Sequence, residues 1–150
     1  MGDSLCRKEG DAKPRLILAD DHEDLLQEIC GLLAPDFEVV RAVRQGSELV
    51  EAALDLRPDV VVSDIHMPGL NGIEAARQIR NRSLCDAVIL LSVSCELEIV
   101  RRALQAGVRG YVVKADAGEE LISAIHSVLA GNTYFSSSVY LTGCPLVPAL

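Results

Sequence analysis

The sequence predicts an α/β fold in which a parallel β-sheet carries helices on both faces. Five short apolar runs alternate with five segments whose apolar residues recur at helical spacing, which indicates five strand–helix units. Most of the runs are apolar at every position, as is typical of parallel strands that are buried on both faces. Because the connections between parallel strands are right-handed, these units are expected to form a doubly wound sheet.

The strands follow from the apolar runs, and they are expected at residues 15–19, 37–42, 60–62, 87–91 and 111–113. The second run mixes polar and apolar residues, and the other four are almost purely aliphatic. Short runs of this kind between helical segments are typical of buried strands.

The helices follow from apolar residues at helical spacing, and they are expected around residues 25–33, 49–54, 73–79, 97–104 and 121–129. Asn71 stands three residues before Glu74, and Asp116 stands three residues before Glu119. Both pairs predict capping boxes, at the starts of the third and fifth helices. Stop signals close the second, fourth and fifth helices at Pro58, Gly107 and Gly131.

Length and composition suit one globular domain of 150 residues, with 49% hydrophobic and 24% charged residues. Residues 1–14 are expected to be a loose leader without a signal peptide, and residues 15–131 to be the domain. Residues 132–150 are rich in serine at first and then contain two prolines, so they are expected to be a tail or linker without a helix.

Charge and cysteine usage narrow the classes of function. A net charge of −8 argues against direct DNA binding by this chain, because contacts to phosphates need a basic face. The cysteine count is odd and no CxxC motif occurs, so reduced thiols and a cytoplasmic location are expected instead of disulfides or a zinc site. No apolar run reaches the length of a membrane span. The cysteines are Cys6, Cys30, Cys85, Cys95 and Cys144.

Polar residues follow four of the predicted strands. Asp20 and Asp21 come after the first strand, Asp64 after the third, Ser92 after the fourth and Lys114 after the fifth. The carboxyl ends of parallel strands share one edge of the sheet, where ligands bind in open α/β folds. Each residue alone has a simpler explanation, as a helix cap, a turn residue or a solvated side chain. Their joint placement predicts a functional site at this edge.

The residue types at this edge suit phosphoryl transfer. Three neighbouring carboxylates repel one another, and a divalent cation removes the conflict. The ligands are oxygens, which favours Mg²⁺ over Zn²⁺. Ser92 and Lys114 could hold the remaining oxygens of a phosphoryl group, and Asp64 is the best candidate nucleophile.

These motifs resemble the receiver domain of bacterial two-component response regulators over about residues 15–131. The resemblance rests on the acidic pair, on Asp64 within SDIHMPGLNG, on Ser92, and on Lys114 within GYVVKADAGEEL. It implies a flavodoxin-like (βα)5 fold with a five-stranded sheet in the order 2-1-3-4-5. It also implies a phosphorelay in which a sensor histidine kinase phosphorylates Asp64.

The resemblance further implies how the site works. Mg²⁺ would be bound by Asp21 and Asp64, by the backbone carbonyl of His66, and through water by Asp20. Ser92 and Lys114 would contact the phosphoryl oxygens, and the rotamer of Tyr111 would follow Ser92 as a switch. The chain would catalyse only its own phosphoryl transfer and autodephosphorylation, so it is not expected to be an enzyme in the usual sense.

Two longer stretches, RPDVVVSDIHMPGLNGIEAARQIR and AGVRGYVVKADAGEELISAIHSVLAGNTYFSSSV, are similar to the LuxR-type subfamily. That subfamily regulates transcription through a C-terminal helix-turn-helix, which is expected to be missing from these 150 residues. The chain is therefore interpreted as a stand-alone or truncated receiver. The resemblance implies a homodimer surface either on the fourth helix, fifth strand and fifth helix or on the first and fifth helices.

Three residues near the site are expected to tune it. Val93 stands where the family usually has Ala or Gly, so it is expected to narrow access to Asp64. His66 and Ser94 each follow a site residue by two positions, from which side chains in this family tune dephosphorylation. Val93 leaves open a phosphorylation-independent interaction module. A small-molecule phosphatase with an aspartate nucleophile is a weaker alternative, because no DxD motif follows the first strand.

Overall fold

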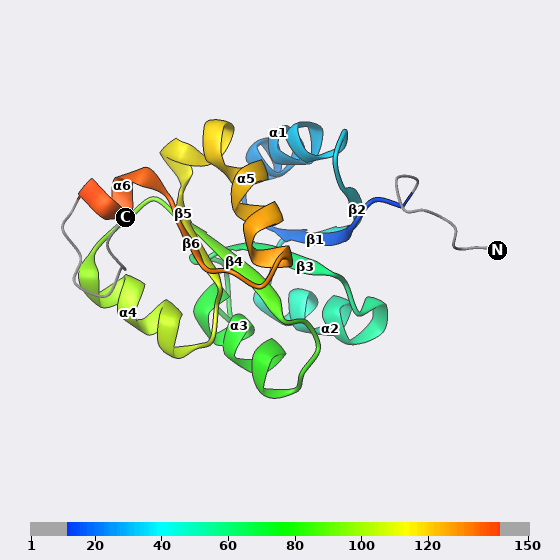
Figure 1. Cartoon of the computed structure of the whole chain (residues 1–150). Helices are drawn as coiled ribbons and strands as arrows, with labels where there is room; N and C mark the ends of the chain where they lie inside the picture. The colour runs from blue at the N-terminus through cyan, green and yellow to red at the C-terminus, as the bar shows by residue number, and fades with distance from the viewer. Residues whose placement is uncertain (1–11, 142–150) are drawn as a thin grey trace.

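The computed structural model describes residues 12–141, which form three layers around one central sheet (Figure 1). The strands are β1 (Arg15–Ala19), β2 (Glu38–Val43), β3 (Val60–Asp64), β4 (Ala87–Ser92), β5 (Gly110–Val113) and β6 (Tyr134–Phe135). All neighbouring strands are parallel, in the order β2-β1-β3-β4-β5-β6. The parallel α/β class is confirmed, but the count of five strands is wrong, because β6 adds a sixth at the edge of β5.

The helices lie on both faces of the sheet. They are α1 (Glu23–Leu33), α2 (Gly46–Leu56), α3 (Gly72–Asn81), α4 (Leu97–Gln105), α5 (Ala117–Leu129) and α6 (Ser137–Leu141), with a 3-10 turn η2 (Lys114–Asp116) before α5. Two aliphatic clusters separate the layers, one joining the sheet to α1 and α5, the other joining it to α2, α3 and α4. Every residue of β3, β4 and β5 is buried, as the continuous apolar runs predict.

One of the two predicted helix caps is present and the other is wrong. The side chain of Asn71 accepts a hydrogen bond from the backbone N–H of Glu74 at 2.9 Å, and so caps α3. Asp116 does not cap α5. Its carboxylate accepts hydrogen bonds from the backbone N–H and the hydroxyl of Ser138, both at 3.1 Å. The contact with Ser138, distant in sequence, replaces the local cap.

The beginning of the predicted tail is ordered structure, so the expectation that it contains no helix is wrong. Residues 134–141 form β6 and α6 and pack beside β5 and α5 (Figure 1). The backbone N–H of Ser136 donates to the carbonyl of Tyr111 at 3.0 Å, and its buried hydroxyl accepts from the N–H of Val113 at 2.9 Å. Phe135 and Val139 are also buried in the aliphatic cluster on the side of α2, α3 and α4. The strand has only two residues, which is too short to give a recognisable apolar pattern. The rest of the tail, residues 142–150, lies outside the described residues.

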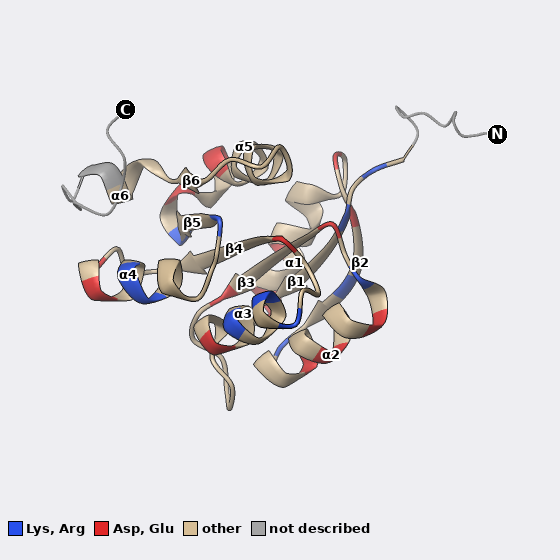
Figure 2. Cartoon of the chain, turned by 60° about the horizontal axis from the view of Figure 1, so that its bottom comes forward, with Lys and Arg blue, Asp and Glu red and all other residues tan. Residues whose placement is uncertain are grey.

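The sign of the charged residues differs between α2 and its neighbours α3 and α4. Acidic residues prevail on α2, whereas α3 and α4 carry acidic and basic residues together (Figure 2). On α3, Arg77 pairs with Glu74, and on α4, Arg101 pairs with Glu98. Exposed pairs of this kind contribute little to stability, so folding depends mainly on the two aliphatic clusters.

The cysteines within the described residues are free thiols. Cys30 and Cys95 are half-buried and Cys85 is buried, while Cys6 and Cys144 lie outside the described residues. Burial raises the pKa of Cys85 to about 11, which disfavours the reactive thiolate. Over residues 12–141, no helix has both the length and the apolar composition needed to cross a membrane.

Replacing Gly31 with Ala is expected to stabilise the protein by about 1 kcal/mol. Gly31 lies inside α1 on its exposed side, and a Cβ built at this position meets no atom within 4 Å. The substitution removes backbone freedom from the unfolded chain without creating a clash. Urea denaturation of the two proteins measures the difference, and a destabilised variant would contradict the expectation.

Candidate functional site

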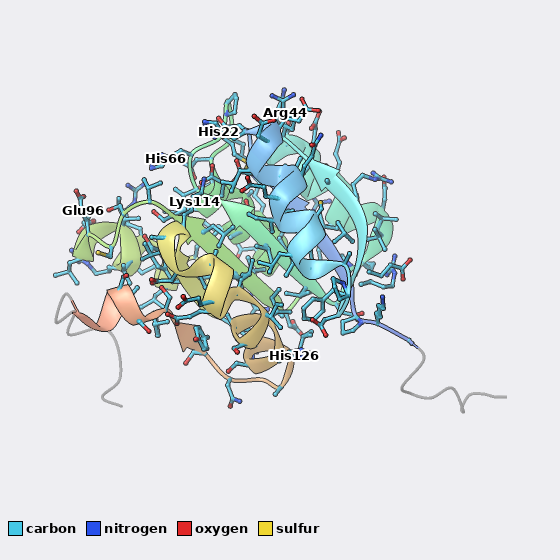
Figure 3. All side chains as sticks on the ribbon, turned by 90° about the horizontal axis from the view of Figure 1, so that it is seen from above. His22, Arg44, His66, Glu96, Lys114 and His126 are labelled. Atoms are coloured by element: carbon cyan, nitrogen blue, oxygen red, sulfur yellow. The ribbon has the colours of Figure 1, made fainter. Side chains whose placement is uncertain are left out.

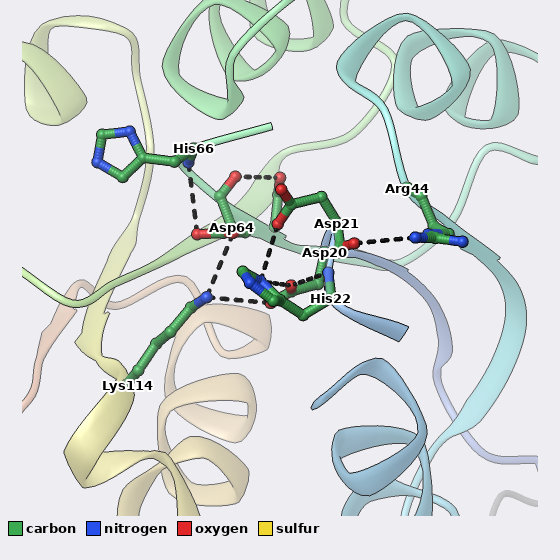
Figure 4. A network of polar contacts seen from close by, with 8 residues as sticks. Asp20, Asp21, His22, Arg44, Asp64, His66 and Lys114 are labelled. Carbon is green, nitrogen blue, oxygen red and sulfur yellow. Dashed lines mark hydrogen bonds and ion pairs between the residues drawn. The ribbon is translucent and has the colours of Figure 1, made fainter. Parts of the chain in front are cut away.

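The polar residues that follow the strands meet at one edge of the sheet (Figures 3 and 4). Asp20 and Asp21 directly follow β1, Asp64 ends β3, and Lys114 directly follows β5. The Nζ of Lys114 lies 3.2 Å from Oδ2 of Asp20 and 3.2 Å from Oδ2 of Asp64. The ammonium group therefore bridges carboxylates that come from two different strands.

The two carboxylates beside Lys114 are almost completely buried. Asp20 is 0% exposed and Asp64 is 3% exposed. Burial raises the pKa of Asp64, while the positive charge of Lys114 lowers it and the negative charge of Asp20 raises it. Although Lys114 is present, the net direction is upward. Lys114 thus offsets only part of the cost of burying the negative charge of Asp64. A cation bound at the site would offset more of it.

Four side chains could hold such a cation. Ligand atoms of Asp20, Asp21, His22 and Asp64 all lie within 4.8 Å of one another. Oδ2 of Asp20 and Oδ1 of Asp21 are buried atoms, and each faces one nitrogen, Nζ of Lys114 at 3.2 Å and Nδ1 of His22 at 3.1 Å. Carboxylate oxygens are the ligands that a divalent cation such as Mg²⁺ prefers. The group therefore fits a metal ion.

The loop after β3 is held tightly behind Asp64. The backbone N–H of Gly72 donates to the carbonyl of Ile65 at 2.7 Å, and Gly69 turns the chain with a φ of 72°. The backbone N–H of His66 lies 3.4 Å from Oδ1 of Asp64. The imidazole of His66 is exposed and points away from the carboxylates (Figure 4). The loop thus brings the backbone of His66, not its side chain, to the site.

Ser92, Ser94 and Tyr111 form a connected group beside the site. The hydroxyl of Ser92 is buried and accepts a hydrogen bond from the backbone N–H of Ser94 at 3.0 Å. The hydroxyl of Tyr111 donates to the carbonyl of Ser94 at 2.6 Å, and the residue is 0% exposed. Burial raises the pKa of Tyr111, and a hydrogen bond with Ser92 opposes this shift. The geometry links Tyr111 to the β4–α4 loop, while its role as a switch stays a prediction.

Val93 lies at the surface. It is 72% exposed, so most of its side chain faces solvent. The expectation that Val93 narrows access to Asp64 stays a prediction, as do the tuning roles of His66 and Ser94.

Two residues at the site were missed from the sequence. Nδ1 of His22 lies 3.1 Å from Oδ1 of Asp21 and 3.6 Å from Oδ1 of Asp20. Arg44 follows β2 and donates a hydrogen bond to the backbone carbonyl of Asp21 at 3.2 Å. The position of each residue in the sequence could have revealed it. His22 directly follows the acidic pair, and Arg44 directly follows a strand of the same sheet.

Comparison with known proteins is consistent with this geometry. Residues 16–126 match the response regulator receiver domain family. The chain is 36% identical over 126 residues to the nitrate/nitrite response regulator protein NarL of Escherichia coli K12. The aligned region covers 83% of this chain and 58% of NarL. It is 34% identical over 128 residues to the response regulator GacA of Pseudomonas aeruginosa, covering 83% of this chain and 59% of GacA. The chain thus spans less than two thirds of the length of these relatives.

The fold of this chain is also similar to those of solved structures. One is a two-component response regulator of the LuxR family from Aurantimonas, with a TM-score of 0.81 and 29% sequence identity. The similarity covers 87% of this chain and 94% of that one.

Proposed function

Since this chain belongs to the response regulator receiver domain family, we propose that it is a Mg²⁺-dependent switch phosphorylated on Asp64 by a sensor histidine kinase. The resemblance predicted from the motifs is confirmed by the family match. The observation that carries the proposal is the position of Lys114, within 3.2 Å of both Asp20 and Asp64 among carboxylates that suit a divalent cation.

The proposed transfer uses Asp64 as the nucleophile. Its carboxylate oxygen forms a new P–O bond while the P–N bond of a phosphohistidine breaks, and the imidazole leaves with the electron pair. Lys114 neutralises charge on the phosphoryl oxygens, and Ser92 donates its hydroxyl hydrogen to them. Asp21, Asp64 and the carbonyl of His66 would hold Mg²⁺, with Asp20 binding it through water, and the ion would supply further positive charge. The loop that Gly72 closes keeps that carbonyl in place.

The proposed switch passes through Ser92 and Tyr111. A phosphoryl group that accepts the hydroxyl hydrogen of Ser92 competes with the hydrogen bond between Ser92 and Tyr111. The oxygen of Ser92 also accepts from the N–H of Ser94, so movement of Ser92 carries the β4–α4 loop with it. The carbonyl of Ser94 holds the hydroxyl of Tyr111, so movement of the β4–α4 loop changes the preferred position of Tyr111. The populations of two states then shift without a new fold.

The proposed partners are the kinase and a second copy of the chain. The copy would bind through either α4–β5–α5 or α1–α5, and the first surface now includes β6 and α6 beside β5. The chain spans 58% of NarL, so transcription regulation is proposed only for a longer protein that contains this domain. Autodephosphorylation and a cytoplasmic location belong to the same proposal, and no direct DNA contact by this chain is required.

Incubation with a small acyl phosphate is expected to add one phosphoryl group to the chain in the presence of Mg²⁺. Removal of the metal with a chelator should lower the initial rate by on the order of 100-fold, because the charge of three carboxylates then opposes the phosphate. Intact mass spectrometry measures the product. Incorporation that is equally fast without a divalent cation would contradict the metal requirement. No incorporation under either condition would favour a phosphorylation-independent interaction module.

A further inference from the structure

Lys114 reaches the site from the short turn η2, of which it is the first residue. Its ammonium lies 3.2 Å from Oδ2 of Asp20 and 3.2 Å from Oδ2 of Asp64, and its side chain is 16% exposed (Figure 4). The ammonium of a lysine is a point charge on a long flexible stem, so its position depends on where the backbone begins. The contacts that hold η2 therefore decide how well the ammonium is placed.

The β6–α6 segment holds the backbone on both sides of η2. Directly before the turn, the backbone N–H of Val113 donates to the buried hydroxyl oxygen of Ser136 at 2.9 Å. At the last residue of the turn, the carboxylate of Asp116 accepts hydrogen bonds from the backbone N–H and the hydroxyl of Ser138, both at 3.1 Å. A segment that lies far along the chain thus fixes the turn from which the ammonium extends.

The carboxylate of Asp116 is a strong acceptor for these bonds. Burial raises the pKa of Asp116, but hydrogen bonds with Ser136 and Ser138 outweigh this effect, and the pKa lies below its ordinary value. The group is therefore ionised at neutral pH, and hydrogen bonds to an ionised carboxylate are stronger than those between neutral groups.

The β6–α6 segment has anchors of its own, so it can serve as a fixed support for η2. Phe135 and Val139 are 6% and 0% exposed, and both belong to the aliphatic cluster on the side of α2, α3 and α4. The backbone N–H of Ser137 also donates to the carboxylate of Glu120 on α5, at 3.1 Å and 3.2 Å from its two oxygens. These contacts are independent of the bonds to η2, and the loss of one hydroxyl there should leave the segment docked.

We propose that Ser138 is a positioning residue for phosphoryl transfer, which acts through Asp116 and η2 to keep the ammonium of Lys114 directed at the phosphoryl group. The inference rests on the proposed function, because it concerns the same transfer, and it adds the β6–α6 segment to the residues on which the transfer depends. Lys114 is not a ligand of the proposed cation. The role therefore predicts slower transfer with unchanged affinity for Mg²⁺, whereas general disorder at this edge of the sheet would lower both.

The initial rate of phosphoryl incorporation from a small acyl phosphate, measured on the full chain by intact mass spectrometry at saturating Mg²⁺, tests this role. Ser138→Ala should lower the rate roughly tenfold, because a small misplacement of a reacting or stabilising group is costly. Ser138→Thr keeps the hydroxyl and should restore most of the rate. Ser137→Ala is the matched control, since Ser137 is exposed and bonds Glu120 through a backbone N–H that alanine retains. Calorimetric titration should give equal Mg²⁺ affinity for all of these proteins.

A double-mutant cycle with Lys114→Ala tests the route of the effect. If Ser138 acts through Lys114, adding Ser138→Ala to Lys114→Ala should not lower the residual rate further. The role of Ser138 would be overturned by an unchanged rate in Ser138→Ala, by a parallel loss of Mg²⁺ affinity, or by an equal further loss in the Lys114→Ala background. Each of these outcomes leaves incorporation by wild type intact. A wild-type chain that accepts no phosphoryl group would instead refute the proposed function, and the role of Ser138 with it.

Discussion

Asp64→Asn is expected to lower phosphoryl incorporation from a small acyl phosphate by on the order of 100-fold or more. The amide cannot attack phosphorus as a carboxylate does, and the other carboxylates beside Lys114 belong to the predicted cation site instead. Incorporation is measured by intact mass spectrometry in the presence of Mg²⁺. Asp59→Asn is the matched control, because Asp59 directly precedes β3, away from the site, and its carboxylate accepts from the backbone N–H of Arg15.

The same substitution should not unfold the protein. Burial raises the pKa of Asp64 in the folded state, an effect that Lys114 opposes and Asp20 strengthens. A carboxyl with a raised folded pKa favours folding below its unfolded pKa, and this contribution is lost as the pH rises through the folded value. At neutral pH the metal-free wild type therefore carries a cost that the neutral amide avoids.

The unfolding midpoint of Asp64→Asn without metal should accordingly equal or exceed that of wild type at neutral pH. The difference should shrink as the pH falls toward the ordinary range of a carboxyl. If the variant kept rapid incorporation while Asp59→Asn lost it, the nucleophile would be assigned to the wrong residue. If it were instead clearly less stable at neutral pH, the ion pair with Lys114 would outweigh the cost of burial.

Gly72→Ala is expected to destabilise the protein by about 3 kcal/mol or more. A Cβ at this position would lie 2.0 Å from the backbone oxygen of Asp64 and 2.9 Å from Cα of Ile65. Both neighbours are backbone atoms of the β3 end, which cannot rotate away as a side chain could. The start of α3 or the end of β3 has to move, and the hydrogen bond from Gly72 to Ile65 would be strained.

Two measurements test this expectation. Urea denaturation gives the loss of stability, with Gly31→Ala as the control, because that glycine is also helical and has open space around it. The displaced β3 end should also slow phosphoryl incorporation at Asp64, even at temperatures where the variant is folded. A variant as stable as wild type would show that the close approach of α3 to β3 is not required.

Most of the fold could be predicted because apolar periodicity and burial agree along the chain. The buried strands β3, β4 and β5 correspond to continuous apolar runs, and the five long helices follow the predicted spacing. β6 could not be found in this way, since it has only two residues, of which one, Phe135, is buried in the core. The incorrect cap at Asp116 has a related cause, because Ser138 competes for its carboxylate from far along the chain.

The candidate site could be predicted in part, because the topology of a parallel sheet alone brings strand ends together. This rule predicts Asp20, Asp64 and Lys114 at one edge of the sheet, and the structure brings them within 3.2 Å contacts there. It does not specify side-chain direction, so His66 was expected as a tuning side chain although its ring points away from the site. His22 was missed although it directly follows the acidic pair in the sequence.

The short strand β6 covers β5 at one edge of the sheet, and this cover affects how readily the protein self-associates in concentrated solution. An uncovered edge strand offers unpaired N–H and C=O groups to other chains and promotes aggregation. Along this edge, the N–H of Tyr134 donates to the carbonyl of Arg109, the residue before β5, and Ser136 bonds to both Tyr111 and Val113 of β5. β6 has only two residues, so it is too short to present much of an edge itself. A chain cut after residue 132 would uncover β5 and should therefore self-associate far more readily.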